Sequence, residues 1–140
     1  MREILPRTMS QENVEVVKRA VAAVNKRDVD AYLSCCTKDV QLSTPLTEVS
    51  GVYEGPDGIR RFFADVGDTG PDFQLTIERV DAVGPDRVLA FMLVTATGRA
   101  SGIPQDARTA NVYDLAGGKI ERIRIFVDRE QALEAAGLSE

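Results

Sequence analysis

Three side chains of this sequence are candidates for chemistry: Asn111, Tyr32 and Glu48. Asn111 is an amide on an apolar, alternating stripe of a predicted strand, where an amide without a hydrogen-bond partner is costly. Tyr32 lies on the apolar face of a predicted short helix, and its phenol can donate a hydrogen bond. Glu48 is a carboxylate in a predicted loop. Together such groups could hold a carbonyl or hydroxyl group and move one proton.

Each of these residues also has a purely structural interpretation. Asn111 could hydrogen-bond Tyr32, Tyr53, a threonine or an ordered water and only hold the core in register. Tyr32 could be a packed ring with its hydroxyl at the rim, and Glu48 a solvated surface carboxylate. The sequence alone leaves both interpretations open for all three residues.

Histidine is absent from the 140 residues. Its absence excludes Ser-His-Asp and Cys-His nucleophilic chemistry and histidine-ligated zinc. The two cysteines, Cys35 and Cys36, are adjacent in a predicted helix and form neither a disulfide framework nor a metal site. We therefore expect no metal and no cofactor, and any catalysis must use carboxylates, phenols, amides, hydroxyls or cations.

Composition favours an ordinary globular domain, with 44% hydrophobic and 28% charged residues. The 17 basic and 22 acidic residues give a formal net charge of -5, and the basic residues are scattered, so nucleic acid is a poor partner. No apolar run reaches the roughly 18 residues of a membrane span, and no signal peptide is evident, so we expect a cytoplasmic protein.

The first half of the chain has helical periodicity. Residues 1–9 are expected to be an N-terminal extension, and residues 10–138 the domain. The predicted elements are a helix over residues 10–26 capped by Ser10, a short helix after Asp28, a strand over residues 40–44 that stops at Pro45, a loop, and a helix that follows residues 55–58 with Ile59, Phe62, Phe63 and Val66 on one face.

The second half changes to a period of two. The predicted strands are residues 73–77, a nearly unbroken apolar run over residues 88–94 that should be covered on both faces, residues 108–115 and residues 120–127, followed by a helix from Asp128 to Gly137. Three helices followed by antiparallel strands predict an α+β fold, with the helices over the concave face of a strongly curved sheet. Such an arrangement can leave a pocket between helices and sheet.

Five short sequence segments show a resemblance to a known family. They are residues 10–14 (SQENV), 27–31 (RDVDA), 53–63 (YEGPDGIRRFF), 117–120 (GGKI) and 128–138 (DREQALEAAGL). In these segments and in element order, residues 10–138 resemble the SnoaL-like branch of the nuclear transport factor 2-like superfamily. The resemblance implies a cone-shaped fold with a deep cavity and a homodimer through the outer face of the sheet, where Arg122, Arg124 and Phe126 would lie.

The resemblance also allows the family's chemistries to be compared with this chain. The general-base aspartate of the steroid isomerases corresponds to Thr44, and their oxyanion-hole residues to Ala20 and Asn111, of which only Asn111 is a hydrogen-bond donor. The charged residues of the limonene-epoxide hydrolases correspond to Thr95, Leu93 and Ile125. Neither set of catalytic groups is present.

The sequence therefore predicts a SnoaL-like cavity protein that binds a small, largely apolar metabolite. The alternative is a cofactor-independent enzyme of the cyclase, isomerase or dehydratase type that uses Asn111, Tyr32 and a carboxylate from the pocket mouth such as Glu48. Glu121, which shares the inward parity of Ile123 but lies near a turn, could also be this acid, and each of the two could equally be a solvated surface carboxylate. Phe62, Phe63 and Phe91 could form an apolar wall for a flat ligand or be plain core. The residues expected to point inward and contact the ligand are Thr44, Phe62, Phe63, Phe91, Leu93, Thr95, Tyr113 and Ile125.

Overall fold

The computed structural model describes residues 9–45, 51–70, 72–96 and 106–138. The elements are α1 (Met9–Lys26), α2 (Val29–Ser34), β1 (Cys36–Ser43), β2 (Tyr53–Glu54), α4 (Gly55–Thr69), β3 (Gln74–Ala82), β4 (Arg87–Thr95), β5 (Ala107–Ala116), β6 (Lys119–Phe126) and α5 (Arg129–Ala136).

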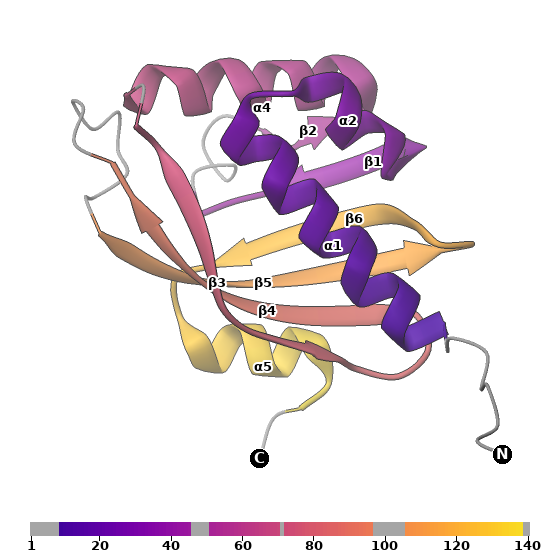
Figure 1. The fold of residues 1–140 in the computed structure, drawn as a ribbon. Helices are drawn as coiled ribbons and strands as arrows, with labels where there is room; N and C mark the ends of the chain where they lie inside the picture. The colour runs from indigo at the N-terminus through magenta and orange to yellow at the C-terminus, as the bar shows by residue number, and fades with distance from the viewer. Residues whose placement is uncertain (1–8, 46–50, 71, 97–105, 139–140) are drawn as a thin grey trace, which may run out of the picture.

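The strands form one curved, mainly antiparallel sheet in the order β2-β1-β6-β5-β4-β3, in which only β1 and β6 pair in parallel. Helices α1, α2 and α4 cover one face, here called the inner face, and α5 packs on the opposite, outer face (Figure 1). The predicted α+β class and helix-covered sheet are confirmed.

Capping explains where the two short helices begin. The Asp28 carboxylate accepts a hydrogen bond from the Ala31 amide at 3.1 Å, and Asp128 accepts from the Glu130 and Gln131 amides. Gly137 ends α5 in the left-handed conformation that favours glycine. The cap predicted at Ser10 is wrong, because α1 already begins at Met9; the Ser10 hydroxyl instead donates to the Gly84 carbonyl.

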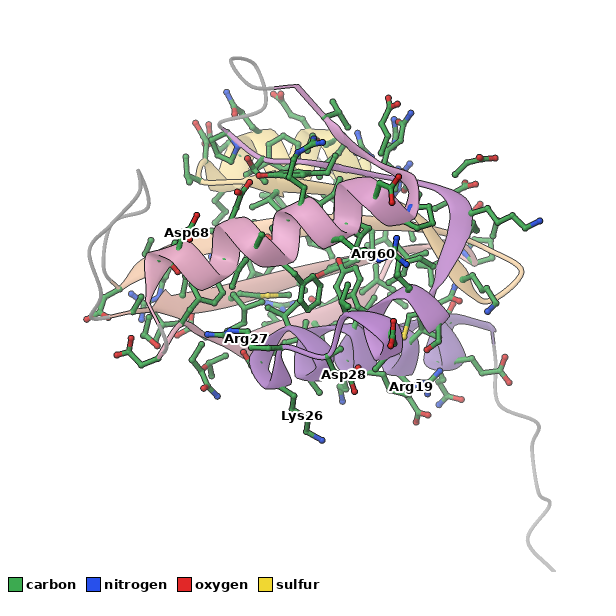
Figure 2. The ribbon with its side chains drawn as sticks, turned by 90° about the horizontal axis from the view of Figure 1, so that it is seen from above. Arg19, Lys26, Arg27, Asp28, Arg60 and Asp68 are labelled. Atoms are coloured by element: carbon green, nitrogen blue, oxygen red, sulfur yellow. The ribbon has the colours of Figure 1, made fainter. Side chains whose placement is uncertain are left out.

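Helix α1 is attached to the sheet at both of its ends. Near the N-terminal end, the Asn13 side chain donates to the Pro85 carbonyl at 2.9 Å. Near the C-terminal end, Asn25 exchanges two hydrogen bonds with the backbone of Leu75. Its charged residues stay outside, as Figure 2 shows for Lys26. These contacts fix the apolar face of α1 against the inner face of the sheet.

Gly58 allows α4 to approach β2 closely. A Cβ atom at this position would lie 2.7 Å from the Tyr53 backbone carbon, a distance that real Cβ atoms do not show. The absence of a side chain therefore brings Phe62 and Phe63 of the same helix over the core. Strand β2, which lies within the predicted loop, supplies the other side of this contact.

The core has two parts, one on each face of the sheet. The larger lies between α1, α2, α4 and the inner face, and includes Val88, Ala90 and Met92 of β4. The smaller lies under α5 and includes Leu89, Ala110 and Val112. As predicted, β4 is covered on both faces.

The predicted orientation of β4 is wrong by one residue. Met92 and Ala90 face the helices, and alternation therefore turns Phe91, Leu93 and Thr95 to the outer face. Phe91 packs in the core under α5, and the guanidinium carbon of Arg129 lies 4.5 Å from the centre of its ring. The prediction failed because residues 88–94 are apolar without interruption, so no alternation of polar and apolar residues indicates which side chains face the helices.

Candidate ligand site on the inner face

Asn111 lies on the inner face near the middle of β5, opposite Ala90 of β4 and Ile125 of β6. It is only 4% exposed. Its amide nitrogen donates to the sulfur of Met92 at 3.6 Å, and among the described residues its Oδ1 atom has no hydrogen-bond partner. A buried amide oxygen without a donor costs about 1–3 kcal/mol of folding stability. The Asn111 side chain therefore destabilises the unliganded fold.

Two buried phenols lie beside this amide. Burial raises the pKa of Tyr113 to about 12, although a side-chain hydrogen bond with Asn111 acts to lower it. Burial also raises the pKa of Tyr32 well above its usual value, and Tyr113, Cys36 and Cys35 act in the same direction. Both phenols therefore stay protonated at neutral pH and can act as hydrogen-bond donors.

Aromatic rings connect Tyr32 to α4. The rings of Tyr32 and Phe63 are 5.3 Å apart and edge-to-face, and those of Phe63 and Phe62 are 6.1 Å apart. The Phe62 ring in turn contacts Tyr53 at 5.5 Å. We call the group formed by Tyr32, Phe63, Met92, Asn111 and Tyr113 the Asn111 cluster.

The structure brings only part of the predicted ligand set to this cluster. Tyr32, Phe62, Phe63, Asn111, Tyr113 and Ile125 lie between the helices and the inner face. Phe91, Leu93 and Thr95, which were expected to contact the ligand, lie instead on the outer face. Thr44 follows β1 directly and is half-buried, and Glu48 lies outside the described residues.

No carboxylate of the described residues is buried in the Asn111 cluster. The buried acid, Asp114, lies on the outer face. Glu121, expected to share the inward parity of Ile123, lies instead beside Arg122 and Asp114, because the register shifts between Asp114 and Leu115.

The carboxylate next to the aromatic rings is Asp65 of α4, which the sequence did not indicate. Tyr53 donates a hydrogen bond to its Oδ2 atom at 2.5 Å. Burial raises the pKa of Tyr53 to about 12, and the hydrogen bond to Asp65 adds to this rise. The two residues are 12 positions apart on different elements, so no local pattern could have paired them.

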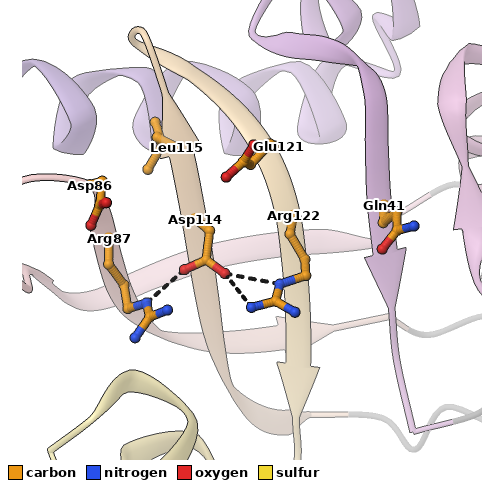
Figure 3. A pocket seen from close by; sticks show the side chains of 7 residues that line it. All are labelled: Gln41, Asp86, Arg87, Asp114, Leu115, Glu121 and Arg122. Atoms are coloured by element: carbon orange, nitrogen blue, oxygen red, sulfur yellow. Dashed lines mark hydrogen bonds and ion pairs between the residues drawn. The ribbon is translucent and has the colours of Figure 1, made fainter.

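The outer face holds a dense charge network around Asp114. The Nε atom of Arg87 lies 2.6 Å from the Oδ1 atom of Asp114, and Arg122 donates to its Oδ2 atom (Figure 3). Arg124 also donates to Oδ2, at 3.2 Å. Although burial alone would raise the pKa of Asp114, the hydrogen bonds from Arg87 and Arg122 lower it overall. Asp114 is therefore ionised at neutral pH.

The predicted partner residues do lie on the outer face, but α5 already contacts two of them. Phe126 packs against the core under α5, and Arg124 donates to the Ala135 carbonyl of α5 at 3.5 Å. The Arg122 side chain remains 46% exposed. Helix α5 therefore covers part of the surface that was expected to contact a second copy of the chain.

Two hollows on the described surface are lined by residues that do not include Asn111. One, of about 350 Å³, surrounds Asp114; the other, of about 530 Å³, lies between α1 and Ala82. Within the described residues, no cluster of three metal-ligating side chains occurs, and no helix is both long enough and apolar enough to cross a membrane.

Comparison with known proteins agrees with this architecture. The sequence matches the model of the SnoaL-like domain over residues 17–123. No curated protein matches the chain. An uncharacterized cystatin-fold protein from Novosphingobium aromaticivorans is 30% identical, with a TM-score of 0.67 over 81% of this chain and 97% of that one.

Two further solved structures share the fold at lower identity. A protein described as a SnoaL-like polyketide cyclase from Jannaschia sp. CCS1 is 20% identical, with a TM-score of 0.70 over 100% of this chain and 99% of that one. TerC, co-crystallised with polyporic acid, is 22% identical, with a TM-score of 0.71 over 90% and 98%.

The helix-covered, curved six-stranded sheet places the molecule in the nuclear transport factor 2-like class of α+β folds. Because the family model covers well over half of the sequence, the chain belongs to the SnoaL-like domain family.

Proposed function

We propose that the protein binds a small, largely apolar molecule at the Asn111 cluster. The observation that carries this proposal is the buried Oδ1 atom of Asn111, which has no donor among the described residues. A ligand hydroxyl group placed there would satisfy it, and the neighbouring rings of Phe63 and Tyr32 would contact the apolar part of the ligand.

Binding at this position requires side chains to move, because Asn111, Tyr32 and Tyr113 are each less than 5% exposed. Met92 is well suited to move, since its unbranched side chain adopts many conformations and its sulfur is a weak acceptor. Replacing the contact from Asn111 to the Met92 sulfur by two full hydrogen bonds to a ligand would favour the liganded state.

The experiment compares 2-naphthol with naphthalene, two flat molecules that differ by one hydroxyl group. The chain contains no tryptophan, so the fluorescence of the probe can be followed directly. We expect wild type to bind 2-naphthol about tenfold more tightly than naphthalene, the effect of one hydrogen bond of about 1.4 kcal/mol. Asn111→Leu should keep the affinity for naphthalene and lose the preference for 2-naphthol.

Asn13→Leu is the matched control, because Asn13 is an equally buried amide on α1, away from the cluster. This variant should keep the preference for 2-naphthol. Failure of wild type to bind either compound, or an unchanged preference in Asn111→Leu, would overturn the proposed function.

A second candidate function is an enzyme of the cyclase, isomerase or dehydratase type. The observation that favours it is the hydrogen bond from Tyr53 to Asp65 beside Phe62, which provides an oriented carboxylate next to the aromatic rings. Asp65 then joins Glu48 as a candidate acid or base, with Asn111 and Tyr32 as donors to a substrate oxygen. Turnover of an aromatic polyketone substrate that Asp65→Asn or Glu48→Gln reduces at least tenfold, with Asp68→Asn unaffected, would establish catalysis.

We further propose a cytoplasmic homodimer built on the domain of residues 10–138. The proposed contact is the part of the outer face that α5 leaves free beside the hollow around Asp114, with the half-exposed side chain of Arg122 at its border. Light scattering of the purified chain should give twice the 15.3 kDa mass, and a monomer at micromolar concentration would contradict this.

A further inference from the structure

The outer face carries a second feature, which does not depend on the proposed function. The hollow of about 350 Å³ around Asp114 is lined by Gln41, Asp86, Arg87, Asp114, Leu115, Glu121 and Arg122. Figure 3 shows the side chains of Arg87 and Arg122 on either side of the Asp114 carboxylate. This hollow therefore has a charged centre between two partly exposed cations.

The charges in direct contact are not balanced. Three guanidinium groups, from Arg87, Arg122 and Arg124, lie within 3.2 Å of the single Asp114 carboxylate. Among the described residues no second carboxylate forms an ion pair with any of them. Two positive charges in this network are thus left without a contacting anion.

Unused hydrogen-bond donors accompany this excess of charge. Arg87 donates to Asp114 through its Nε atom alone, so both terminal nitrogens of the Arg87 guanidinium are without a described acceptor. In Figure 3 they extend beyond the Asp114 carboxylate on the same side as the terminal nitrogens of Arg122. The Nε atom of Arg124 is buried and has no partner among the described residues. A planar guanidinium with free terminal nitrogens matches a carboxylate or phosphate group.

Two exposed carboxylates limit what the hollow accepts. Asp86 and Glu121 line it without pairing with the arginines. Being solvent-exposed they are screened, but together with the net charge of -5 they disfavour a polyanion. A compact molecule with one anionic group fits this distribution best.

We propose that this hollow binds the carboxylate or phosphate group of a small molecule between Arg87 and Arg122. The occupant would supply acceptors for the arginine N–H groups that Asp114 does not use, while Asp114 holds the two guanidinium groups on either side of its carboxylate (Figure 3). The side-chain amide of Gln41, which also lines the hollow, would contribute a neutral donor.

The test follows the arginine side-chain NH signals by NMR during titration with inorganic phosphate and, separately, with acetate. Sodium chloride at equal ionic strength is the reference. We expect a saturable shift of the Arg87 and Arg122 signals with one or both anions, at a Kd of about 1 mM or below. The anion that binds more tightly identifies the ligand group as phosphate or carboxylate.

Two variants and one control make the result specific. Arg122→Gln should weaken binding at least tenfold, and Glu121→Gln, which leaves the network intact, should strengthen it about threefold by removing a like charge. Arg108→Gln is the control, since Arg108 lies on the same face in a one-to-one pair with Glu78; it should change nothing. The proposal is overturned if neither anion gives a saturable shift, or if Arg108→Gln weakens binding as much as Arg122→Gln.

Discussion

The amide nitrogen of Asn111 on β5 donates to the sulfur of Met92 on β4 at 3.6 Å, while the amide oxygen of Asn111 is buried without a described partner. Asn13 is the other buried side-chain amide of the described residues, and its Oδ1 atom is likewise buried without a described partner. It differs from Asn111 in its nitrogen, which donates to the Pro85 carbonyl at 2.9 Å. Asn13 therefore connects α1 to the backbone between β3 and β4, whereas the described contacts of the Asn111 side chain are with other side chains, those of Met92 and Tyr113.

This difference predicts opposite effects of the same substitution on stability. Asn111→Leu should raise the free energy of unfolding by about 1–2 kcal/mol, because it removes a poorly satisfied buried amide. Asn13→Leu should lower it by about 1–2 kcal/mol, because it leaves the Pro85 carbonyl without its donor. Urea denaturation followed by circular dichroism measures both. A loss of stability in Asn111→Leu would show that the amide is a structural necessity.

The three tyrosines should ionise at a higher pH in the folded protein than in the unfolded chain. Burial raises the pKa of Tyr32 well above its usual value and those of Tyr53 and Tyr113 to about 12. Because the folded-state pKa values are raised, the stability linked to these phenols is full below their unfolded pKa of about 10 and is lost as the pH rises through about 12. Ultraviolet absorbance at a pH of about 10.5 should show few phenolates in the native protein and mostly phenolates in urea.

Asp65→Asn provides the control for that titration. It removes the carboxylate charge that helps to raise the pKa of Tyr53. The Tyr53 phenol should therefore ionise at a lower pH, while the pKa values of Tyr32 and Tyr113 stay the same. Early ionisation of all three phenols in wild type would contradict the packing of the Asn111 cluster.

Acid should weaken the outer-face network. Hydrogen bonds from Arg87 and Arg122 overcome the effect of burial and lower the pKa of Asp114. Its contribution to stability is therefore present above the unfolded pKa of about 4 and is lost as the pH falls through the lower folded value.

Asp114→Asn should consequently lower the free energy of unfolding at neutral pH by about 2–4 kcal/mol and flatten its decline below a pH of about 4. Asp81→Asn, which breaks an exposed pair with Arg79, should change it by less than about 1 kcal/mol. Equal effects of the two substitutions, measured by denaturation across pH, would argue against a dominant role for the Asp114 network.

Two glycines of α4 should respond oppositely to alanine. Gly58→Ala places a Cβ atom 2.7 Å from the Tyr53 backbone carbon, so the helix must shift, at a cost of about 2 kcal/mol or more. Gly67→Ala meets no atom within 4 Å and should stabilise the helix by about 0.5–1 kcal/mol. Thermal denaturation compares the two. A neutral Gly58→Ala would mean that α4 is not held against β2.

The sequence predicts most of the fold because its periodic signals are strong and local. The alternation of residues 108–115 and 120–127 correctly places Asn111, Tyr113 and Ile125 on the inner face. The same reasoning fails for Phe91, Leu93 and Thr95. Strand β4 is apolar on both faces, so its sequence does not indicate which residues point to the inner face.

Other parts of the site depend on contacts that no local pattern records. The hydrogen bond from Tyr53 to Asp65 joins β2 to α4, and the cluster of Asp114 with Arg87 joins β5 to β4. Packing of α5 on the outer face likewise depends on the register of β4 and β5, so it could not be predicted from the amphipathic pattern of α5 alone.

The most direct test of the account is the side-chain amide NMR signal of Asn111 during titration with 2-naphthol. The chain has only three asparagines, and Asn13 and Asn25 are both bonded to backbone groups, so they serve as internal references. The account predicts a saturable shift of the Asn111 signal while the other two stay in place. Saturable binding of 2-naphthol that leaves the Asn111 signal unmoved would contradict it.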